Sequence, residues 1–120
     1  MKETREMSPR THDLARLAKR IPQKVKNEVN EYLRILKKDG LPIEKALIFG
    51  SYAVGKADKE SDIDLCVISR KFNNAFWAMQ YLWKKLPYKK NRIEPVGFNP
   101  KDFAEGGSLI EEIKKFGVKV

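Results

Sequence analysis

The chain has 120 residues and a formal net charge of +9, and 42% of its residues are hydrophobic. This length fits one compact domain with a buried core and excludes a second, substrate-binding domain. Since no apolar run approaches the roughly 18 residues of a membrane span, and residues 1–10 lack the apolar stretch of a signal peptide, a cytoplasmic protein without membrane contact is expected.

The positive charge predicts a negatively charged binding partner, such as a nucleotide, a nucleic acid or an acidic protein. It does not choose among them, because the Lys and Arg residues are spread along the chain. Most of them fall on predicted helices, where a solvated helix face is the simplest explanation.

Cysteine and histidine each occur only once in the chain, and this limits the possible chemistry further. Cys66 is the only cysteine, which excludes an intramolecular disulfide and the paired cysteines of a zinc site. Its apolar neighbours predict a buried, structural thiol. His12 is the only histidine, so metal sites with several histidines are excluded, and we expect His12 at the surface.

The chain begins with a basic, weakly patterned stretch over residues 1–20, which predicts an N-terminal arm or a short helix. Residues 21–120 are predicted to form a single domain. Its first helix is expected over 22–38, where apolar residues recur at spacings of three and four. A short apolar strand over 46–49 follows and runs into a tight turn at Gly50-Ser51.

Two further strands are predicted beyond this turn. The apolar run over 63–68 indicates a buried strand. Residues 92–98 alternate well enough for a third strand, and Pro95 indicates either an edge position or a distortion of this strand.

Two further helices complete the predicted elements. A helix over 74–86 carries apolar residues that we expect in the core: Phe76, Trp77, Met79, Leu82, Trp83 and Leu86. A last helix is predicted over 108–116, with Ser108 and Glu111 as a capping box. This order of elements predicts an α+β fold in which a small mixed β-sheet is packed against helices.

Two carboxylates mark the start of the second strand. Residues two apart in a strand point to the same face, so Asp62 and Asp64 project together while Ile63 and Leu65 point into the core. Two adjacent carboxylates repel each other unless a cation lies between them, and Mg²⁺ prefers such oxygen ligands. An acidic pair in a solvated loop is the alternative interpretation.

The Gly50-Ser51 turn is a second candidate feature. Glycine lets the backbone turn sharply after a strand, and Ser51 offers a hydroxyl and a backbone N–H at the start of a short helix. Such a turn can hold phosphate oxygens, although a Gly-Ser pair also occurs in ordinary turns. Its position about ten residues before Asp62 predicts a phosphate site opposite a metal site on neighbouring strands.

Together these residues resemble a known family. The segments Phe49-Gly-Ser-Tyr-Ala-Val-Gly55 and Ser61-Asp-Ile-Asp-Leu65 are similar to the signature of the DNA polymerase β nucleotidyltransferase superfamily. The resemblance is closest to its small prokaryotic members, the minimal nucleotidyltransferases, and is strong over residues 43–68. It implies the polymerase β-like nucleotidyltransferase fold.

The resemblance also implies roles for individual acidic residues. Asp62 and Asp64 are the matching catalytic, Mg²⁺-binding residues, and two ions are implied. Glu94 is the best match to the family's third catalytic and metal-binding carboxylate, with Asp102 as the fallback. Asp58 and Glu60 are expected in a solvated loop.

The nucleotide-binding residues implied by the resemblance are Gly50, Ser51, Lys56 and Ser61. ATP or another nucleoside triphosphate is then the substrate. The sequence departs from the family at Val54, where many relatives carry a basic residue. Either this charge is absent, or Lys56 or Lys59 supplies it from the same loop.

The implied activity is Mg²⁺-dependent transfer of a nucleoside monophosphate, AMP from ATP, to an acceptor hydroxyl. Stand-alone domains of this size resemble the antitoxins of two-gene toxin–antitoxin pairs, in which the toxin is a helical HEPN ribonuclease. In that family the nucleotidyltransferase adds AMP to a tyrosine of the toxin, or binds and neutralises it. A HEPN-type toxin is therefore the expected protein partner.

Three alternatives stay open. The first is a catalytically silent module that keeps the fold only to bind and neutralise a partner, as the departure at Val54 suggests. The others are a nucleotidyltransferase acting on a small molecule and one acting on a nucleic acid, which the charge permits but does not favour. A homo-oligomer is compatible with each of them.

Overall fold

Four strands form one mixed sheet in the computed structural model, which describes residues 21–87 and 92–120. The strand order is β3-β2-β1-β4, with β1 antiparallel to β2 and β4, and with β2 parallel to β3. The strands are Lys45–Phe49 (β1), Ile63–Ile68 (β2), Ile93–Phe98 (β3) and Val118–Lys119 (β4). The predicted arm over 1–20, with His12, lies outside the described residues.

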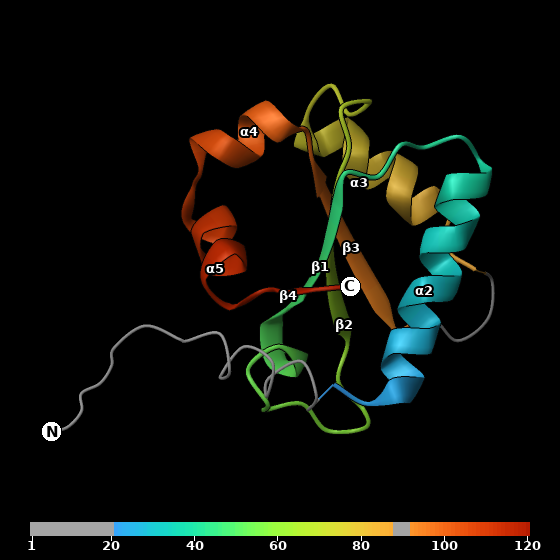
Figure 1. Cartoon of the computed structure of the whole chain (residues 1–120), viewed down its shortest axis with the longest axis vertical. Helices are drawn as coiled ribbons and strands as arrows, with labels where there is room; N and C mark the ends of the chain where they lie inside the picture. Colours follow the sequence, from blue (N-terminus) through green and yellow to red (C-terminus); the bar gives the residue numbers. More distant parts are fainter. Residues whose placement is uncertain (1–20, 88–91) are drawn as a thin grey trace, which may run out of the picture.

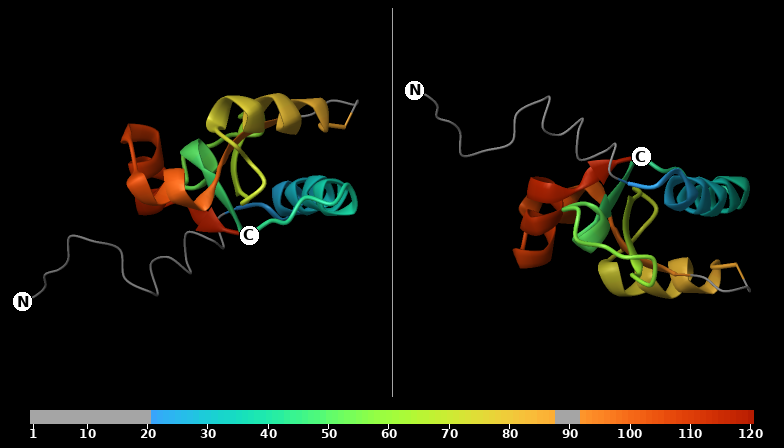
Figure 2. Two further views of the ribbon diagram at one scale, coloured as in Figure 1. Left: turned by 90° about the horizontal axis from the view of Figure 1, so that it is seen from above. Right: turned by 90° about the horizontal axis from the view of Figure 1, so that it is seen from below.

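Helices cover both faces of this sheet (Figure 1). The helices are α2 (Gln23–Lys38), the 3₁₀ turn η2 (Gly50–Tyr52), α3 (Ala75–Lys84), α4 (Pro100–Glu105) and α5 (Ser108–Phe116). Helices α2 and α3 lie on one side of the sheet and α4 and α5 on the other, as Figure 2 also shows. The predicted α+β fold is therefore confirmed. None of the described helices combines the length and apolar character needed to cross a membrane.

Helix α2 buries the apolar face that its sequence predicts. Its buried residues are Val25, Val29, Tyr32, Leu33 and Leu36. The Tyr32 hydroxyl donates a buried hydrogen bond of 2.6 Å to the backbone oxygen of Leu82 and so joins α2 to α3. Gly40, with φ 92°, follows the helix end, where a left-handed residue suits a helix stop.

The prediction that the apolar residues of α3 fill the core is wrong for most of them. Ala78 and Leu82 are fully buried and Leu86 is partly buried. The exposed side chains are Phe76 (56% exposed), Trp77 (58%), Met79 (41%) and Trp83 (48%). Gly97 on β3 explains this, because a Cβ there would lie 2.7–2.9 Å from side chains of Phe72 and α3. The helix lies so close to β3 that its narrow inner side holds few side chains.

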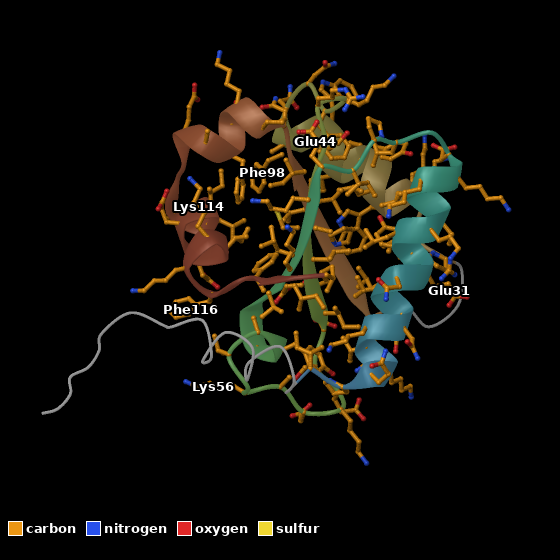
Figure 3. The ribbon with its side chains drawn as sticks, in the orientation of Figure 1. Glu31, Glu44, Lys56, Phe98, Lys114 and Phe116 are labelled. Atoms are coloured by element: carbon orange, nitrogen blue, oxygen red, sulfur yellow. The ribbon has the colours of Figure 1, made fainter. Side chains whose placement is uncertain are left out.

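Side chains alternate in direction along each strand, so the two faces of the sheet carry different residues. Ile63 and Leu65 are fully buried, and they belong to the core cluster that includes α2 and α3. The opposite face is apolar over most of its length, with Leu47, Cys66, Ile68, Val96 and Phe98 packed together. Phe98 points toward α4 and α5 (Figure 3), which cover this part of the face.

Cys66 has the buried, structural environment that was predicted. Its side chain is fully buried on β2. Burial raises the pKa of its thiol to about 12, so very little reactive thiolate forms at neutral pH.

Most predicted element positions are confirmed, with three exceptions. The strand over 63–68 and the helix over 108–116 have the predicted bounds, and β3 lies at the sheet edge, one of the two possibilities that Pro95 indicated. Helix α4 and strand β4 were not predicted, because six and two residues are too few to give a clear periodic pattern. The prediction of a capping box at the start of α5 is wrong, since Gly107 is the N-cap and Ser108 is already helical.

Candidate active site

One row of paired residues crosses the α5 side of the sheet near the start of β2 and β3. Phe49, Asp64 and Glu94 pair in register across β1, β2 and β3. Adjacent strands lie about 4.8 Å apart, so the two carboxylates come from neighbouring positions on one face. The structure therefore brings two of the three predicted catalytic carboxylates together.

Asp62 completes a group of three carboxylates just before β2 begins. The pKa of Glu94 is raised, first because a hydrogen bond with Asp62 favours its protonated form, then by burial and by the charges of Asp62 and Asp64. The pKa of Asp64 is raised first by burial, then by the charges of Asp62 and Glu112. Negative charge is thus concentrated here, and α5 adds Glu112, which no sequence motif had indicated.

The donor chemistry of this carboxylate group fits a divalent cation. Mg²⁺ prefers oxygen ligands. A cation between carboxylates that repel one another stabilises their ionised forms. Within residues 21–87 and 92–120, however, no three His, Cys, Asp or Glu side chains already converge as a metal cage. Asp62 and Glu94 are exposed, so rotation of these side chains can separate their hydrogen-bonded pair and admit an ion.

Gly50 brings the turn after β1 directly against the Asp64 carboxylate. Its φ of 75° lies in the left-handed region that favours glycine. A Cβ at this position would overlap Oδ2 of Asp64 and lie 3.0 Å from its Cγ. Only glycine allows this close approach, so the predicted turn and the predicted carboxylates form one site.

The other predicted nucleotide-binding residues differ in how freely they can bind a ligand. The Ser51 hydroxyl makes no hydrogen bond within the described residues. Lys56 is exposed and extends toward the α5 side of the sheet (Figure 3). Ser61 is engaged in its own loop, where its Oγ accepts from the Asp58 N–H at 2.9 Å and donates to Asp58 Oδ1 at 3.3 Å. Ser61 therefore stabilises the loop before Asp62.

Arg92 fixes this loop, and sequence reasoning did not single it out among 25 basic residues. Its guanidinium donates to Tyr52 Oη at 3.0 Å, Lys59 O at 3.0 Å, Ser61 O at 3.4 Å and Glu28 Oε2 at 3.1 Å. The contact with Glu28 is also an ion pair in which both side chains are mostly buried. One side chain thus joins η2, the loop before Asp62 and helix α2.

We expect Arg92→Ala to lower the free energy of unfolding by about 1–3 kcal/mol, because it leaves several partly buried acceptors without their donor. Chemical denaturation measures this loss. Arg70→Ala is the matched control, since the Arg70 ion pair with Glu44 is largely exposed and its loss costs about 0–1 kcal/mol. Equal losses for both variants would show that Arg92 does not organise the loop.

The remaining acidic candidates are not paired with Asp64 across the sheet. Asp102 is in the first turn of α4, beyond the opposite end of β3 from Glu94. Asp58 and Glu60 are exposed, as predicted, and Asp58 Oδ1 accepts a 2.8 Å hydrogen bond from the Glu60 N–H. Glu94 is therefore the third carboxylate that the fold itself places beside Asp64.

Comparisons with known proteins bear on the family and the fold of the chain. A model of the nucleotidyltransferase domain family matches residues 29–119. The structure is similar to that of a proposed nucleotidyltransferase from Sulfolobus solfataricus, with a TM-score of 0.54 and 19% identity over 88% of this chain and 84% of that chain. It is also similar to a toxin-antitoxin structure with AMP-PNP, with a TM-score of 0.53 and 22% identity over 78% and 69% of the two chains. No curated protein sequence matches significantly.

The family match covers three quarters of the chain. It includes the Gly50 turn and the carboxylates Asp62, Asp64 and Glu94, which the fold gathers at one end of the sheet. The resemblance stated from the sequence is confirmed at the level of the family and the fold: this chain belongs to the nucleotidyltransferase domain family.

Proposed function

We propose that the protein is a Mg²⁺-dependent nucleotidyltransferase that transfers AMP from ATP to a hydroxyl group of a partner protein in the cytoplasm. The observation that carries this proposal is the pairing of Asp64 and Glu94 in register beside the Gly50 turn. This arrangement supports the proposal because it brings carboxylate oxygens into contact with the backbone of a tight turn.

Each site residue has a distinct role in this proposal. Asp62 and Asp64 would hold one Mg²⁺, and Glu94 would help them to hold a second. Gly50 and Ser51 bind the β- and γ-phosphates through backbone N–H groups and the free hydroxyl. Lys56 adds positive charge from the α5 side.

The proposed reaction is an in-line displacement at the α-phosphorus. The acceptor oxygen forms a bond to this phosphorus, the bond to the bridging oxygen breaks, and pyrophosphate leaves. The hydroxyl proton passes to solvent. Bound Mg²⁺ neutralises phosphate charge and lowers the pKa of the acceptor hydroxyl. The residues of this chain contribute by holding the reactants in line.

We propose a protein rather than a small molecule as the acceptor. The partner then presents its own hydroxyl group at the carboxylate site. One structural neighbour is a toxin-antitoxin structure with AMP-PNP, which supports an antitoxin role. The HEPN-type toxin as the acceptor follows from the family resemblance of the sequence.

The test is incubation of the purified protein with Mg²⁺, ATP labelled at the α-phosphate and extract of its source cells. We expect label on one protein, whose mass identifies the partner. The control is the double variant Asp62→Asn/Asp64→Asn, which should give no label. Label that persists with the double variant would show that these carboxylates are not the catalytic residues.

We expect Mg²⁺ to raise the melting temperature at pH 7 and not at about pH 4. The pKa values of Asp64 and Glu94 are raised, so in the folded state their protonated forms are favoured. Their contribution to stability is therefore present below the ordinary carboxyl pKa and lost as pH rises through the raised values. At pH 7 the ionised carboxylates repel one another, and a bound cation removes that cost.

Thermal denaturation with and without MgCl₂, at matched ionic strength, measures this effect. The double variant Asp62→Asn/Asp64→Asn controls for cation binding elsewhere and should show no Mg²⁺-dependent shift at pH 7. An equal shift in the wild type and the double variant would place the cation site outside this carboxylate group.

A second candidate function is inhibitory binding without transfer. Val54 favours it, because this partly buried, apolar residue stands where many relatives carry a basic residue. Mg²⁺-ATP that fails to bind, together with tight binding of a partner protein, would support this function over transfer.

A further inference from the structure

A hollow lies between the start of helix α2 and the loop that joins η2 to β2 (Figure 1). It has a volume of about 420 Å³, within the range of pockets that bind small ligands. Its polar lining comes from Lys24 and Glu28 of α2, Tyr52 of η2, Lys59 of the loop and Arg92 before β3. Segments far apart in the sequence therefore meet at this hollow.

Two lysines of the hollow have no counterion. Arg92 and Glu28 form an ion pair at 3.1 Å, so their charges offset each other. Within residues 21–87 and 92–120, the ammonium groups of Lys24 and Lys59 make no ion pair or hydrogen bond. Two positive charges therefore remain at a concave surface, where the attraction for anions is concentrated.

The start of α2 adds to this positive charge. Its N-cap, Pro22, also lines the hollow and provides no side-chain capping bond. No acidic residue occupies the first turn of the helix. Backbone N–H groups at a helix start carry partial positive charge. The helix end alone would not define a site, but it lies at the same hollow as the two lysines and acts in the same direction.

The hollow differs from the carboxylate site because it can hold phosphate without a metal ion. The carboxylate in its lining, Glu28, is neutralised by Arg92. Asp58 lines an adjoining hollow, where its carboxylate accepts hydrogen bonds from Glu60 N–H and Ser61 Oγ. Lysine ammonium groups bind phosphate oxygens directly. A phosphate-bearing ligand therefore needs no Mg²⁺ here.

The lining favours a ligand with several phosphate groups. Positive charge comes from the two lysines and from the start of α2, and a chain of phosphates offers oxygens to each of them. Pro22 and Val25 add apolar surface to the same hollow, which suits the nucleoside of a nucleotide. A nucleoside polyphosphate and a free polyphosphate share this chemistry.

The hollow is connected to the carboxylate site through the loop. The backbone oxygens of Lys59 and Ser61 both accept hydrogen bonds from Arg92, and Ser61 directly precedes Asp62. A ligand held by both Lys24 and Lys59 joins this loop to α2. Its binding should therefore restrict the motion of the segment that carries Asp62.

We propose that this hollow is a second phosphate-binding site, which takes the polyphosphate group of a nucleotide, or free polyphosphate, without Mg²⁺ and restrains the loop before Asp62. Lys59 then serves this hollow and not the Gly50 turn. The binding does not depend on the proposed function, on which only the consequence of the restraint at Asp62 rests.

Calorimetric titration in the presence of EDTA, at physiological ionic strength, tests the site. The whole purified chain is titrated separately with inorganic tripolyphosphate and with ATP. Lys24→Ala/Lys59→Ala removes the two unpaired lysines. Lys37→Ala/Lys38→Ala is the matched control, since it removes the same charge from exposed positions in the last turn of α2. Unchanged melting temperatures confirm that both double variants fold.

We expect tripolyphosphate to bind the wild type and the control variant nearly equally. Lys24→Ala/Lys59→Ala should weaken this binding by about tenfold or more, because each charge-assisted contact has this scale of effect. ATP that binds more tightly than tripolyphosphate through the same lysines identifies a nucleotide as the ligand. Equal or weaker binding of ATP identifies free polyphosphate.

Amide hydrogen exchange measures the restraint of the loop, because it reports local opening. Tripolyphosphate should slow exchange over residues 57–61 in the wild type and not in Lys24→Ala/Lys59→Ala. Unchanged exchange, despite binding through these lysines, would overturn the restraint and leave the binding site in place.

Other outcomes overturn the site itself. These are the absence of binding without Mg²⁺ and an equal loss of binding in the two double variants. Loss of binding in Lys56→Ala, but not in Lys24→Ala/Lys59→Ala, also overturns it, because the ligand then lies at the Gly50 turn. None of these results decides nucleotidyl transfer. A chain that binds tripolyphosphate as expected and transfers no α label retains this site and loses the proposed function.

Discussion

Asp64→Asn is expected to lower the rate of nucleotidyl transfer by about 100- to 1,000-fold, the scale of loss when one charge-stabilising group is removed from an active site. Asp64 is the central carboxylate, since it pairs in register with Glu94 and contacts the Gly50 turn. Asn keeps the size of the side chain and removes the charge. The rate of label transfer from α-labelled ATP measures the effect.

Glu31→Gln is the matched control, because Glu31 is an exposed acid on α2, which lies on the other side of the sheet from α5 (Figure 3). It should leave transfer unchanged. The melting temperature of Asp64→Asn should not fall, since the substitution removes one of several repelling charges. A normal transfer rate in Asp64→Asn would show that the reaction occurs elsewhere on the chain.

Gly50→Ala is expected to lower transfer by about 100-fold, because a displacement of about 1 Å in a reacting group has this scale of effect. The added Cβ would overlap the Asp64 carboxylate and force it to move. The left-handed backbone adds a stability cost of about 1–2 kcal/mol. Transfer rate and chemical denaturation together separate the two effects.

Gly40→Ala isolates the contact from the backbone strain. Gly40 has a φ of 92°, but a Cβ there would have no atom within 4 Å. This variant should lose a similar amount of stability and retain normal Mg²⁺-ATP binding and transfer. If both variants transfer nucleotide equally well, the close approach of Gly50 to Asp64 has no functional role.

Local sequence patterns were sufficient to predict much of the fold. The buried strand β2 and the amphipathic helix α5 have their predicted bounds, because a continuous apolar run and a 3.6-residue period each depend only on neighbouring residues. The burial of α3 could not be predicted in this way. Its periodicity identifies a helix, whereas the outward direction of Phe76 and Trp83 depends on the close packing of α3 against Gly97, more than ten residues away in sequence.

The site was predictable where motifs supply its residues and not where distant segments meet. The sequence indicated the Gly50 turn and the pair of Asp62 and Asp64, because each is a local pattern. The roles of Arg92 and Glu112 follow from tertiary contacts alone. Arg92 reaches Glu28 across 64 positions of the chain, and Glu112 comes near Asp64 only because α5 packs over the sheet.

The most direct test of the central claim is a paired labelling experiment with ATP labelled at either the α- or the γ-phosphate. In the presence of Mg²⁺ and source extract, nucleotidyl transfer predicts that the α label becomes attached to a protein while the γ label is released in pyrophosphate. Attachment of the γ label would instead show phosphoryl transfer. Such a result, or α label that persists in Asp62→Asn/Asp64→Asn, would contradict the assignment of this carboxylate site to nucleotidyl transfer.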